Sequence, residues 1–588
     1  MRVIVAEKNK VARRIAQVLS GGRYRVRRIY RVPVYEFDGT AVIGLSGHVL
    51  NLDYPVELRS WSRVPAERLL DAEPVLVPTS RRHLMALRAL FKRASEIVIA
   101  TDYDREGELI GYEVVRYLAP EVPVRRAKFS SLTAEELRRA FENLVDLNEP
   151  MAKAGEARQR VDLSWGASLT RLLSVASGRR GRNFLSIGRV QTPTLALIVA
   201  REREIESHVP RPYWSLFLVS GSLRAAHVGN PFWERSEAEA AASRARVPEA
   251  EVVEHEVSER GFIAPAPYDT NTFLRDASRI LGMAPHRAMR VAEDLYAQGL
   301  ISYPRTDNTA YPRGTPFKRI LASLREPYRD LAEEILSGPI RPRAGRKRTT
   351  DHPPIHPVSG ADLDSLDPDH RRVYDLIVRR FLATLMPPAR LRESRTVLDA
   401  GGERFVHRGR EVVSEGWLRA FPFYRPREEP VPRVSVGDRI PVDGVEVVED
   451  KTKPPPRYTV SELLRVMEEL GLGTKSTRHE IIRKLYERKY VYGNPVRPTA
   501  LGRLLIETLE GHDLRILKPE MTARLEEAMD RIERGETSME DVVSESQRIL
   551  RETIRQLREN EEEIAKRLKF RPRNKFKSAN DGKQGPVV

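Results

Sequence analysis

The first 120 residues alternate between short apolar runs and segments with helical periodicity, and this alternation restricts the fold more than any other feature of the chain. The apolar runs predict strands at residues 2–6, 41–45, 75–78 and 97–100. The helical spacing predicts helices at residues 11–19, 83–94 and 108–118. Such alternation is typical of a parallel α/β sheet, whose ligands bind at the carboxyl ends of the strands.

The rest of the chain contains helical and β-like stretches. Helical patterns cover residues 152–205, 272–336, 369–385 and 459–569. β-like patterns cover 213–257 and 391–448, on either side of a helical block. One all-β module built from two separated segments, with the block 265–388 inserted between them, would explain this order.

Composition narrows the class of protein. The 588 residues predict about four domains at roughly 150 residues each. Hydrophobic residues make up 40% and charged residues 31%, which excludes a largely disordered chain. Lys and Arg number 100 against 83 Asp and Glu, a formal net charge of +17, so nucleic acid is the expected partner. An anionic membrane surface is the rival partner. The sequence shows no basic helix with a Trp- or Leu-rich face that would bind such a surface.

Missing features exclude other classes. The sequence has no cysteine, which excludes disulfides, thiolate catalysis and cysteine-based zinc sites. No apolar run reaches the ~18–20 residues that cross a bilayer. Glu7 stands where a signal peptide needs its apolar stretch, so we expect a cytoplasmic protein. The high charge and many prolines also suggest heat stability, which a mesophilic melting temperature would refute.

Four acids follow two of the predicted strands. Asp102, Asp104 and Glu106 come directly after the strand at 97–100, and Glu7 follows the first strand. Alternate residues of an extended segment point the same way, so the acids could converge at the carboxyl ends of parallel strands. Converging carboxylates repel unless a hard cation lies among them, and Mg²⁺ is the natural choice. The alternative is a solvated acidic loop that caps a helix N-terminus.

A tyrosine and an arginine form a second candidate site in the segment LISYPRTD, residues 300–307. The phenol of Tyr303 is a poor nucleophile at neutral pH, but it can attack phosphorus when cations stabilise the developing charge. Arg305 is near enough in sequence to clamp that phosphate. The chain has 19 tyrosines, so a buried structural tyrosine is the alternative.

A histidine pair lies in the segment DHPPIHP, residues 351–357. His352 could contact phosphate or donate a proton, and a histidine in a turn is the simpler interpretation. His356 follows four residues later, but that spacing indicates a metal site only on a helix, and the prolines forbid one here.

Five blocks together resemble the signatures of the type IA DNA topoisomerases, most closely the archaeal topoisomerase III-like members. They occur in family order and at family spacing between residue 1 and about residue 560. The most specific is DLYAQGLISYPRTD at 294–307. The others are VAEK at 5–8, ATDYDREGELI at 100–110, SIGRVQTPTL at 186–195 and GLGTKST at 471–477.

The resemblance implies a multidomain fold of α/β, α and β parts in a four-domain toroid that includes a Toprim α/β domain. In chain order, the implied parts are the Toprim domain (1–150), the first segment of a helical domain (151–211), the first segment of a β arch or gate domain (212–264), an inserted helical domain carrying the nucleophilic tyrosine (265–388), the second arch segment (389–450), the second helical segment with a helix-turn-helix-like DNA-binding unit (451–565), and a basic, disordered tail (566–588).

The same resemblance implies an enzyme that cuts one DNA strand through a 5′-phosphotyrosine, passes a strand through the gate and reseals the break. It would relax negatively supercoiled DNA and decatenate gapped DNA. The phosphotyrosine conserves the bond energy, so no ATP is needed, and the chain has no Walker A loop. The implied cofactor is Mg²⁺, with neither ATP nor zinc.

Residue roles follow from the matching positions. Tyr303 would be the nucleophile, and Glu7 would handle the proton of the 3′-oxygen. Lys8 and Arg305 would stabilise charge on the scissile phosphate, and His352 would contact it. The implied Mg²⁺ ligands are Asp102, Asp104, Glu106 and Glu7. The implied strand-binding residues are Arg160, Arg189, Gln191, Ser476 and Thr477.

The expected partner is DNA, preferably single-stranded or negatively supercoiled, bound by a monomer associated with the nucleoid; a helicase partner is left open. Many bacterial relatives append cysteine-rich zinc modules, which this chain cannot form. The basic residues of the tail could replace them by tracking phosphates while Phe570 and Phe576 stack on bases. A solvated tail with no specific role is the equal alternative.

Two other functions remain open at this point. Residues 459–470 and 476–488, followed by YVYG at 490–493, are typical of a helix-turn-helix with a wing, so a non-catalytic DNA-binding protein is one alternative. A non-catalytic protein of this kind would have no use for the acids at residues 7, 102, 104 and 106 or for Tyr303. The other is a nuclease or primase with the same acids, which would need no Tyr303.

Overall fold

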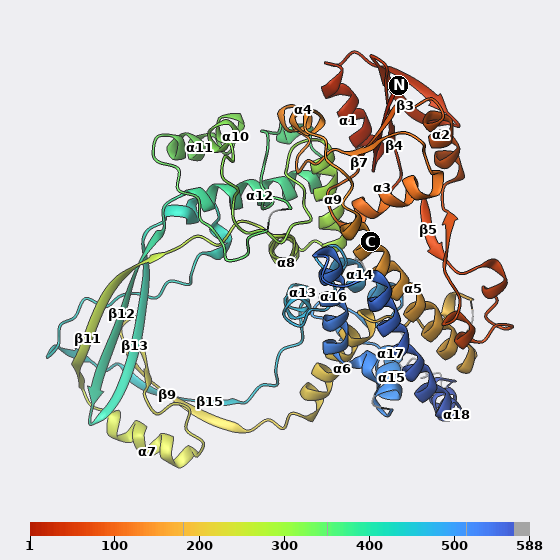
Figure 1. Cartoon of the computed structure of the whole chain (residues 1–588). Coiled ribbons are helices and arrows are strands. Elements are labelled where there is room, and N and C mark those ends of the chain that lie inside the picture. The colour runs from red at the N-terminus through yellow and green to blue at the C-terminus, as the bar shows by residue number, and fades with distance from the viewer. Residues whose placement is uncertain (180, 350, 513, 570–588) are drawn as a thin grey trace, which may run out of the picture. The chain divides into compact units, whose positions relative to one another are not determined.

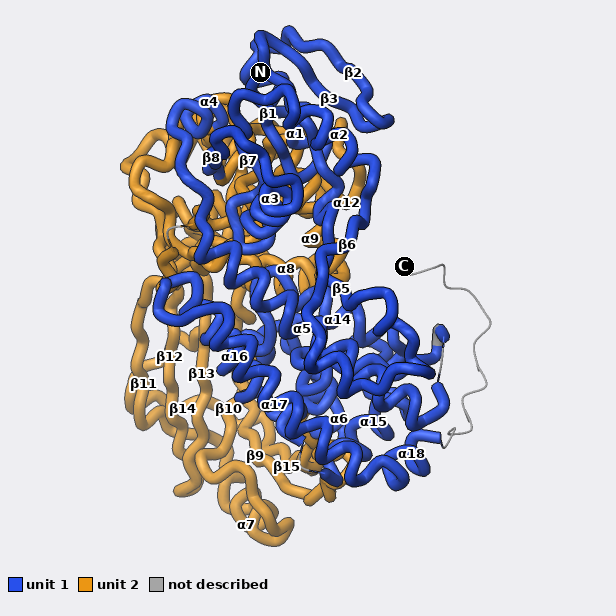
Figure 2. Tube along the Cα trace, turned by 45° about the vertical axis from the view of Figure 1, so that its right-hand side comes forward, with its two compact units in different colours: residues 1–129, 137–202, 457–588 blue, residues 130–136, 203–456 orange. Residues whose placement is uncertain are grey.

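The computed structural model describes residues 1–179, 181–349, 351–512 and 514–569. The chain forms two compact units, each assembled from segments that are distant in the sequence (Figure 2). Unit 1 comprises residues 1–129, 137–202 and 457 onward, and unit 2 comprises 130–136 and 203–456. In the described ranges, no helix is long and apolar enough to cross a membrane.

A six-stranded sheet lies at the N-terminal end of unit 1. Its strand order is β2 (Arg25–Ile29), β3 (Val32–Phe37), β4 (Thr40–Gly44), β1 (Arg2–Ala6), β7 (Glu96–Ala100) and β8 (Val124–Arg126). β1 pairs in parallel with both β4 and β7, and β7 pairs in parallel with β8. β2 and β3 extend this centre as an antiparallel hairpin that the sequence did not predict.

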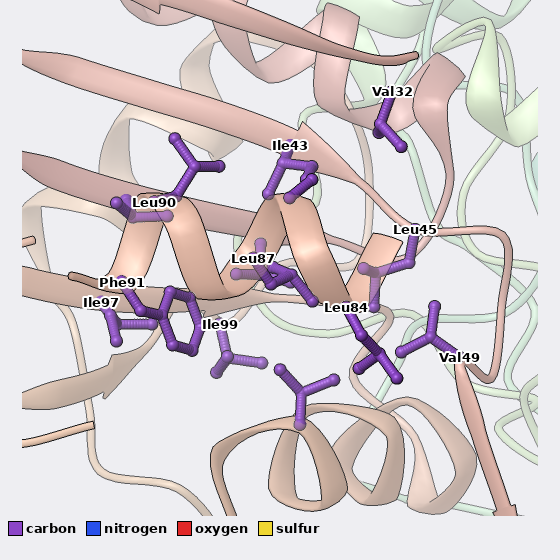
Figure 3. Close-up of a cluster of buried hydrophobic side chains, with 14 of the residues drawn as sticks. Val32, Ile43, Leu45, Val49, Leu84, Leu87, Leu90, Phe91, Ile97 and Ile99 are labelled. Atoms are coloured by element: carbon purple, nitrogen blue, oxygen red, sulfur yellow. The ribbon is translucent and has the colours of Figure 1, made fainter. Parts of the chain in front are cut away.

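Three helices cover this sheet (Figure 1). They are α1 (Asn9–Leu19), α2 (Arg81–Phe91) and α3 (Arg105–Leu118). Leu84, Leu87 and Phe91 of α2 pack with Ile43 and Ile99 of the strands in one buried apolar cluster (Figure 3). The strand predicted at 75–78 exists as β6 (Val75–Pro78), but it pairs with β5 (Leu50–Asp53) in a separate two-stranded sheet.

The remainder of unit 1 is helical and centres on α5 (Glu149–Ala176), which contacts α3, α16 and α17. Asn148 caps its N-terminus, and the buried indole of Trp165 donates to the Ser546 hydroxyl at 2.9 Å. The other helices are α4 (Ala134–Glu142), α6 (Gln191–Ser207), α13 (Val460–Glu469), α14 (Arg478–Glu487), α15 (Ala500–Glu510), α16 (Pro519–Glu533), α17 (Met539–Glu559) and α18 (Glu561–Lys569). A two-stranded sheet, β16 (Val491–Tyr492) and β17 (Arg497–Pro498), follows α14.

Unit 2 contains a seven-stranded antiparallel sheet formed by two separated stretches of chain. The strand order is β14 (Arg439–Pro441), β11 (Glu249–Phe262), β12 (Ala389–Ala400), β13 (Glu403–Ser414), β10 (Leu223–His227), β9 (Pro212–Ser220) and β15 (Gly444–Lys451). Because β11 pairs with β12 and β9 pairs with β15, the two stretches interleave. Helix α7 (Arg235–Ala245) packs its alanines against the core of this sheet.

The helical block between these stretches comprises α8 (Thr270–Leu281), α9 (Pro285–Ala297), α10 (Phe317–Ser323), α11 (Arg329–Leu336) and α12 (Pro368–Leu385). A buried polar cluster connects its entry and exit. Asp276 of α8 accepts hydrogen bonds from the Tyr268 and Tyr424 hydroxyls, both at 2.8 Å. Arg380 of α12 donates to the Ala266 carbonyl and stacks over Tyr268. The entry and exit of the block are therefore held together by satisfied polar groups.

An ion pair with no solvent exposure supports the carboxyl end of β7. Arg126 Nε donates to Glu108 Oε2 at 2.7 Å, and the same guanidinium donates to the carbonyls of Asp102 and Ile99. The second Glu108 oxygen accepts from the Asn148 amide. Arg126 thus ties the strand end, the following turn and α3 to one another.

We expect Arg126→Met to lower the free energy of unfolding by about 3–5 kcal/mol, because it leaves the Glu108 carboxylate buried without a counter-charge. The control is Arg125→Met, since Arg125 is 40% exposed and pairs with an exposed Asp146; its loss should stay below about 1 kcal/mol. Urea unfolding measures both. Equal losses would contradict a supporting role for the buried pair.

Candidate active site

The acids predicted from the sequence lie together at the carboxyl edge of the central strands. β1 and β7 run in register with Ala6 opposite Ala100, so Glu7 and Asp102 leave neighbouring strands side by side. Glu7, Asp102 and Asp104 are each less than 10% exposed. The Asp102 amide donates to Glu7 Oε2 at 3.4 Å. The fold therefore concentrates negative charge at the edge where α/β sheets bind ligands.

The geometric argument for Glu106 was wrong. Helix α3 begins at Arg105, three residues earlier than predicted, so Glu106 lies in its first turn and not in an extended segment. Asp104 is the N-cap residue, and its Oδ1 accepts from the Gly107 amide at 2.8 Å. A Cβ at Gly107 would lie 2.1 Å from the Asp102 carbonyl oxygen, so only glycine allows this close turn. The capping alternative is thus confirmed in part, since Asp104 caps α3 but is buried and not solvated, and metal binding by these acids stays a prediction.

A histidine that sequence reasoning missed lies beside these acids. His48 Nδ1 is 3.2 Å from Glu113 Oε2, and its Nε2 is 3.8 Å from Glu106 Oε1. Burial disfavours its charged form, but the hydrogen bond and charge of Glu113 outweigh burial and raise the pKa of His48. The signal available in the sequence was its place three residues after the strand predicted at 41–45, which pairs with the first strand.

The donor set fits Mg²⁺ in its chemistry. Four carboxylates and no sulfur or imidazole ligand were assigned, and hard oxygen donors are what Mg²⁺ prefers. Within the described residues, no group of three or more Asp, Glu, His or Cys side chains is arranged as a ready metal cage. Mg²⁺ commonly keeps several waters and uses only one or two carboxylates, so such a cage is not required.

Lys8 begins the helix that follows β1. It is the N-cap residue of α1, in an extended conformation, and forms an isolated bridge with Ser46. Its position one residue after Glu7 fixes its backbone at the acidic edge of the sheet.

In unit 2, Tyr303 lies in a non-helical loop between α9 and α10 and is only 2% exposed. Its ring packs against His352, with centroids 4.6 Å apart, and edge-on against Tyr296 at 5.2 Å. Its backbone N–H donates to the Ser130 carbonyl at 2.9 Å. The ring is therefore placed by contacts on several sides.

Hydrogen bonds on both sides of Tyr303 brace this loop. The Ser302 hydroxyl donates to the Pro354 carbonyl at 2.9 Å, and the Thr270 hydroxyl donates to that of Pro304 at 2.8 Å. Ile301 also bridges to Pro357. A loop this heavily bonded holds its tyrosine in one position, which a nucleophile requires.

Arg305 and His352 lie in the same unit as Tyr303. Arg305 donates to Glu293 Oε1 of α9 at 2.6 Å, with both side chains mostly buried. His352 is 2% exposed, and its Nδ1 lies 2.8 Å from the Ser130 hydroxyl. Its carbonyl accepts from the Asn308 amide at 3.0 Å. The structure thus brings Tyr303 and His352 into contact, although 48 residues of sequence separate them.

The predicted strand-binding arginines lie in ion pairs of unit 1. Arg189 is 2% exposed and donates to Asp162 and Glu526 at 2.6 and 2.7 Å. Burial lowers its pKa, but the two carboxylates outweigh this and raise it. Arg160 pairs with Glu156 at 2.9 Å. These contacts favour a structural role for Arg189 between α5, α6 and α16, and strand binding by either arginine stays a prediction.

The other predicted strand-binding residues lie at helix starts. Gln191 begins α6 and is 5% exposed, and its Oε1 accepts from the Ser186 hydroxyl at 3.3 Å. Thr477 precedes α14, and its hydroxyl accepts from the Thr474 amide at 2.9 Å. Ser476 is half-buried beside it. The α13–α14 pair followed by the β16–β17 hairpin gives this region the order of a winged helix-turn-helix.

Comparison with known proteins identifies the class. A family model described as "DNA topoisomerase" matches residues 146–544, and one described as "Toprim domain" matches residues 2–132. These matches cover both the acidic edge of unit 1 and the Tyr303 loop of unit 2. The protein is therefore an enzyme of the isomerase class that acts on DNA topology.

Individual relatives narrow the family. The chain is 42% identical to "DNA topoisomerase 1" of Thermoplasma acidophilum over 563 residues, covering 94% of this chain and 73% of that protein. It is also 42% identical to the protein of the same name from Archaeoglobus fulgidus over 560 residues, covering 94% and 84%. "DNA topoisomerase 3-beta" of Arabidopsis thaliana is 33% identical over 574 residues, covering 92% and 66%.

Among solved structures, full-length topoisomerase I from Thermotoga maritima matches with a TM-score of 0.75 and 26% identity, covering 95% of this chain and 90% of that one. The chain belongs to the type IA DNA topoisomerases. The family and the mixed α/β, α and β fold class predicted from the sequence are confirmed.

Asp104 caps α3 and is also one of the predicted Mg²⁺ ligands, so a substitution that keeps the cap and removes the charge separates the two roles. We expect Asp104→Asn to leave the melting temperature unchanged, because asparagine caps a helix as well as aspartate does. We expect the same change to reduce Mg²⁺-dependent topoisomerase activity at least tenfold, because it removes one carboxylate. Calorimetry and a gel relaxation assay check the two parts. Full activity would show that Asp104 only caps α3.

The pH dependence of stability should depend on the buried His356. Burial lowers the pKa of His356 to about 4, while its Nδ1–H donates to the Pro354 carbonyl. The unfolded chain takes up a proton near pH 6.5 and the folded one does not. The free energy of unfolding should therefore fall by about 3 kcal/mol as pH drops from 6.5 to 4. His356→Gln should flatten this part of the stability profile; an unchanged slope would contradict the assignment.

Proposed function

We propose that the protein cuts one DNA strand, relaxes negatively supercoiled DNA and decatenates gapped DNA, all without ATP. The observation that carries this proposal is Tyr303, held between His352 and Tyr296 in a braced loop of a type IA chain. Negative supercoiling exposes single strands, so fully duplex, positively supercoiled DNA should be a poor substrate. DNA is the substrate, and we propose that a monomer associated with the nucleoid acts on it.

In the proposed cleavage step, Tyr303 Oη attacks the phosphorus, the new P–O bond forms, and the bond from phosphorus to the 3′-oxygen breaks. The phenol gives its proton to solvent, and the departing 3′-oxygen takes one from the Glu7 carboxyl group, which regains a proton from solvent. Lys8 and Arg305 stabilise the charge that develops on the phosphate, and His352 contacts it. Resealing is the reverse attack by the 3′-hydroxyl.

This exchange replaces one phosphodiester by another, so the number of phosphoester bonds stays the same at every stage. The phosphotyrosine therefore stores the energy that the resealing step needs, which explains why no nucleotide hydrolysis is required. Toprim domains generally bind Mg²⁺. We propose that Asp102, Asp104 and Glu106, with Glu7, hold it here, where it would supply positive charge beside the 3′-oxygen. Repulsion among these acids makes the cation most important for rejoining.

We propose that the two DNA ends are held by different parts of the chain. Tyr303 carries the 5′ end on the inserted helical block, and the 3′ end stays with the Toprim and helical parts. The domain division 1–150, 151–211 with 451–565, 212–264 with 389–450, and 265–388 belongs to this proposal. Separation of these domains would open a gate for the second strand.

The test is covalent capture. Single-stranded DNA labelled at either end is incubated with the protein and quenched with denaturant. Wild type should retain only the 3′-end label, joined through the 5′ phosphate, and Tyr303→Phe should retain none. The control is Tyr311→Phe, because Tyr311 is a half-buried tyrosine of the same helical block, and its hydroxyl is hydrogen-bonded to that of Thr384 at 3.2 Å; this variant should still form the adduct.

Two results would overturn the assignment. Cleavage that survives Tyr303→Phe would indicate a nuclease that uses the Toprim acids alone. Binding without any adduct in wild type would favour a non-catalytic DNA-binding protein.

A further inference from the structure

The N-terminal part of unit 1 contains a strongly basic segment that the proposed chemistry does not use. Residues 10–35 include eight Lys or Arg residues and no Asp or Glu, in a chain that has 83 acids among 588 residues. The segment forms α1 and the hairpin of β2 and β3. The next acid, Glu36 of β3, stands opposite Arg25 and accepts from Arg27 at 3.5 Å, and Asp38 follows the end of β3.

The hairpin forms one edge of the six-stranded sheet. β2 is the edge strand, and four consecutive residues, 25–28, are all exposed, so both faces of the strand are open to solvent. Figure 2 shows β2 and β3 at the outer edge of unit 1 beside α1 and α2. Val26 and Tyr30 are 54% and 51% exposed. We define the basic hairpin surface as Arg23, Arg25, Arg27, Arg28, Tyr30 and Arg31.

The turn of the hairpin has unusual residues for its conformation. Only Tyr30 and Arg31 separate β2 from β3, and both have positive φ, 49° and 67°. A two-residue turn of this kind normally selects Asn and Gly, because bulkier residues are strained there. The side chains of Tyr30 and Arg31 are both exposed, so packing does not explain why these residues occupy a strained turn. This favours a role for the two side chains in binding.

The adjacent helix adds charge of the same sign. α2 contacts β3, and between Glu73 and Glu96 the sequence carries five Lys or Arg residues and no acid. Four exposed arginines in this stretch are residues 81, 82, 88 and 93. An edge strand needs only a few charges to prevent aggregation, so this accumulation exceeds what edge protection requires.

We propose that the basic hairpin surface binds the sugar–phosphate backbone of duplex DNA, apart from the single strand that is cut. The arginines are forked donors suited to phosphate oxygens. β2 is an exposed edge strand, so its arginines can lie along the phosphates of a duplex. A single-strand site needs a series of exposed aromatic platforms. On this surface Tyr30 is exposed, whereas Tyr24 is half-buried and packs edge-on against Tyr35. The surface would anchor the duplex that flanks the gap.

The test uses Arg→Gln at residues 23, 25, 27 and 28, which leaves the strained turn intact. All proteins carry Tyr303→Phe, so the outcome is independent of the proposed cleavage chemistry. Fluorescence anisotropy measures binding of a 30-base-pair duplex and of a single-stranded 30-mer across a KCl series. The matched control is Arg→Gln at the exposed residues 408, 427, 433 and 439 of unit 2.

We expect the hairpin variant to bind the duplex at least tenfold more weakly near 0.1 M salt. The slope of log affinity against log salt should become shallower by about three, since each lost phosphate contact removes about 0.9. Single-strand affinity should change less than threefold, and the control should keep the duplex affinity. Arg→Lys at the same four residues should retain most of the binding.

Three results would overturn the proposal: an unchanged duplex affinity, an equal loss for both DNAs, or binding to phosphatidylserine vesicles that the duplex does not compete. If the Gln variant fails to fold, the proposal is tested instead by the rate of amide hydrogen exchange at residues 23–31 in the protein with the unmodified hairpin. Duplex DNA should slow that exchange and the single strand should not, and the reverse pattern would refute the assignment.

Discussion

Unit 1 depends on the convergence of carboxylates at the ends of two neighbouring parallel strands. Glu7 and Asp102 leave β1 and β7 side by side, and burying such charges is costly unless their surroundings compensate. Part of the compensation comes from backbone donors, such as the Gly107 amide on Asp104. Arg126 adds a buried positive charge whose donors fix the carbonyls of the same turn. The backbone of this edge is thus fixed by donors on both sides of the turn.

In unit 2, Tyr303 is held in place although it belongs to no helix or strand. The hydroxyls of Ser302 and Thr306, in the loop around Tyr303, donate to the backbone carbonyls of Pro354 and His352 in a second loop. The polar cluster around Asp276 fixes the helical block that carries both loops. The acids therefore belong to unit 1 and the tyrosine to unit 2.

Sequence patterns predicted the strands that build the sheet centre, since residues 2–6 and 97–100 are apolar runs with no competing signal. The β2–β3 hairpin was missed because its arginines hide the alternation of a strand. Asp104 is a typical N-cap residue, and a helix that starts directly after it includes Glu106. The prediction placed the helix start at residue 108 and therefore put Glu106 wrongly in an extended segment. The buried pairs of Arg189 with Asp162 and Glu526, and of His352 with Ser130, could not be predicted, because each joins residues far apart in the sequence.

The central claim is that strand passage occurs through a break in one strand, with energy stored in a phosphotyrosine. A single purified topoisomer of a negatively supercoiled plasmid, incubated with Mg²⁺ and no nucleotide, tests it most directly. The account predicts that the linking number changes in steps of one, because one strand is cut at a time. Steps of two, or a requirement for ATP, would contradict it.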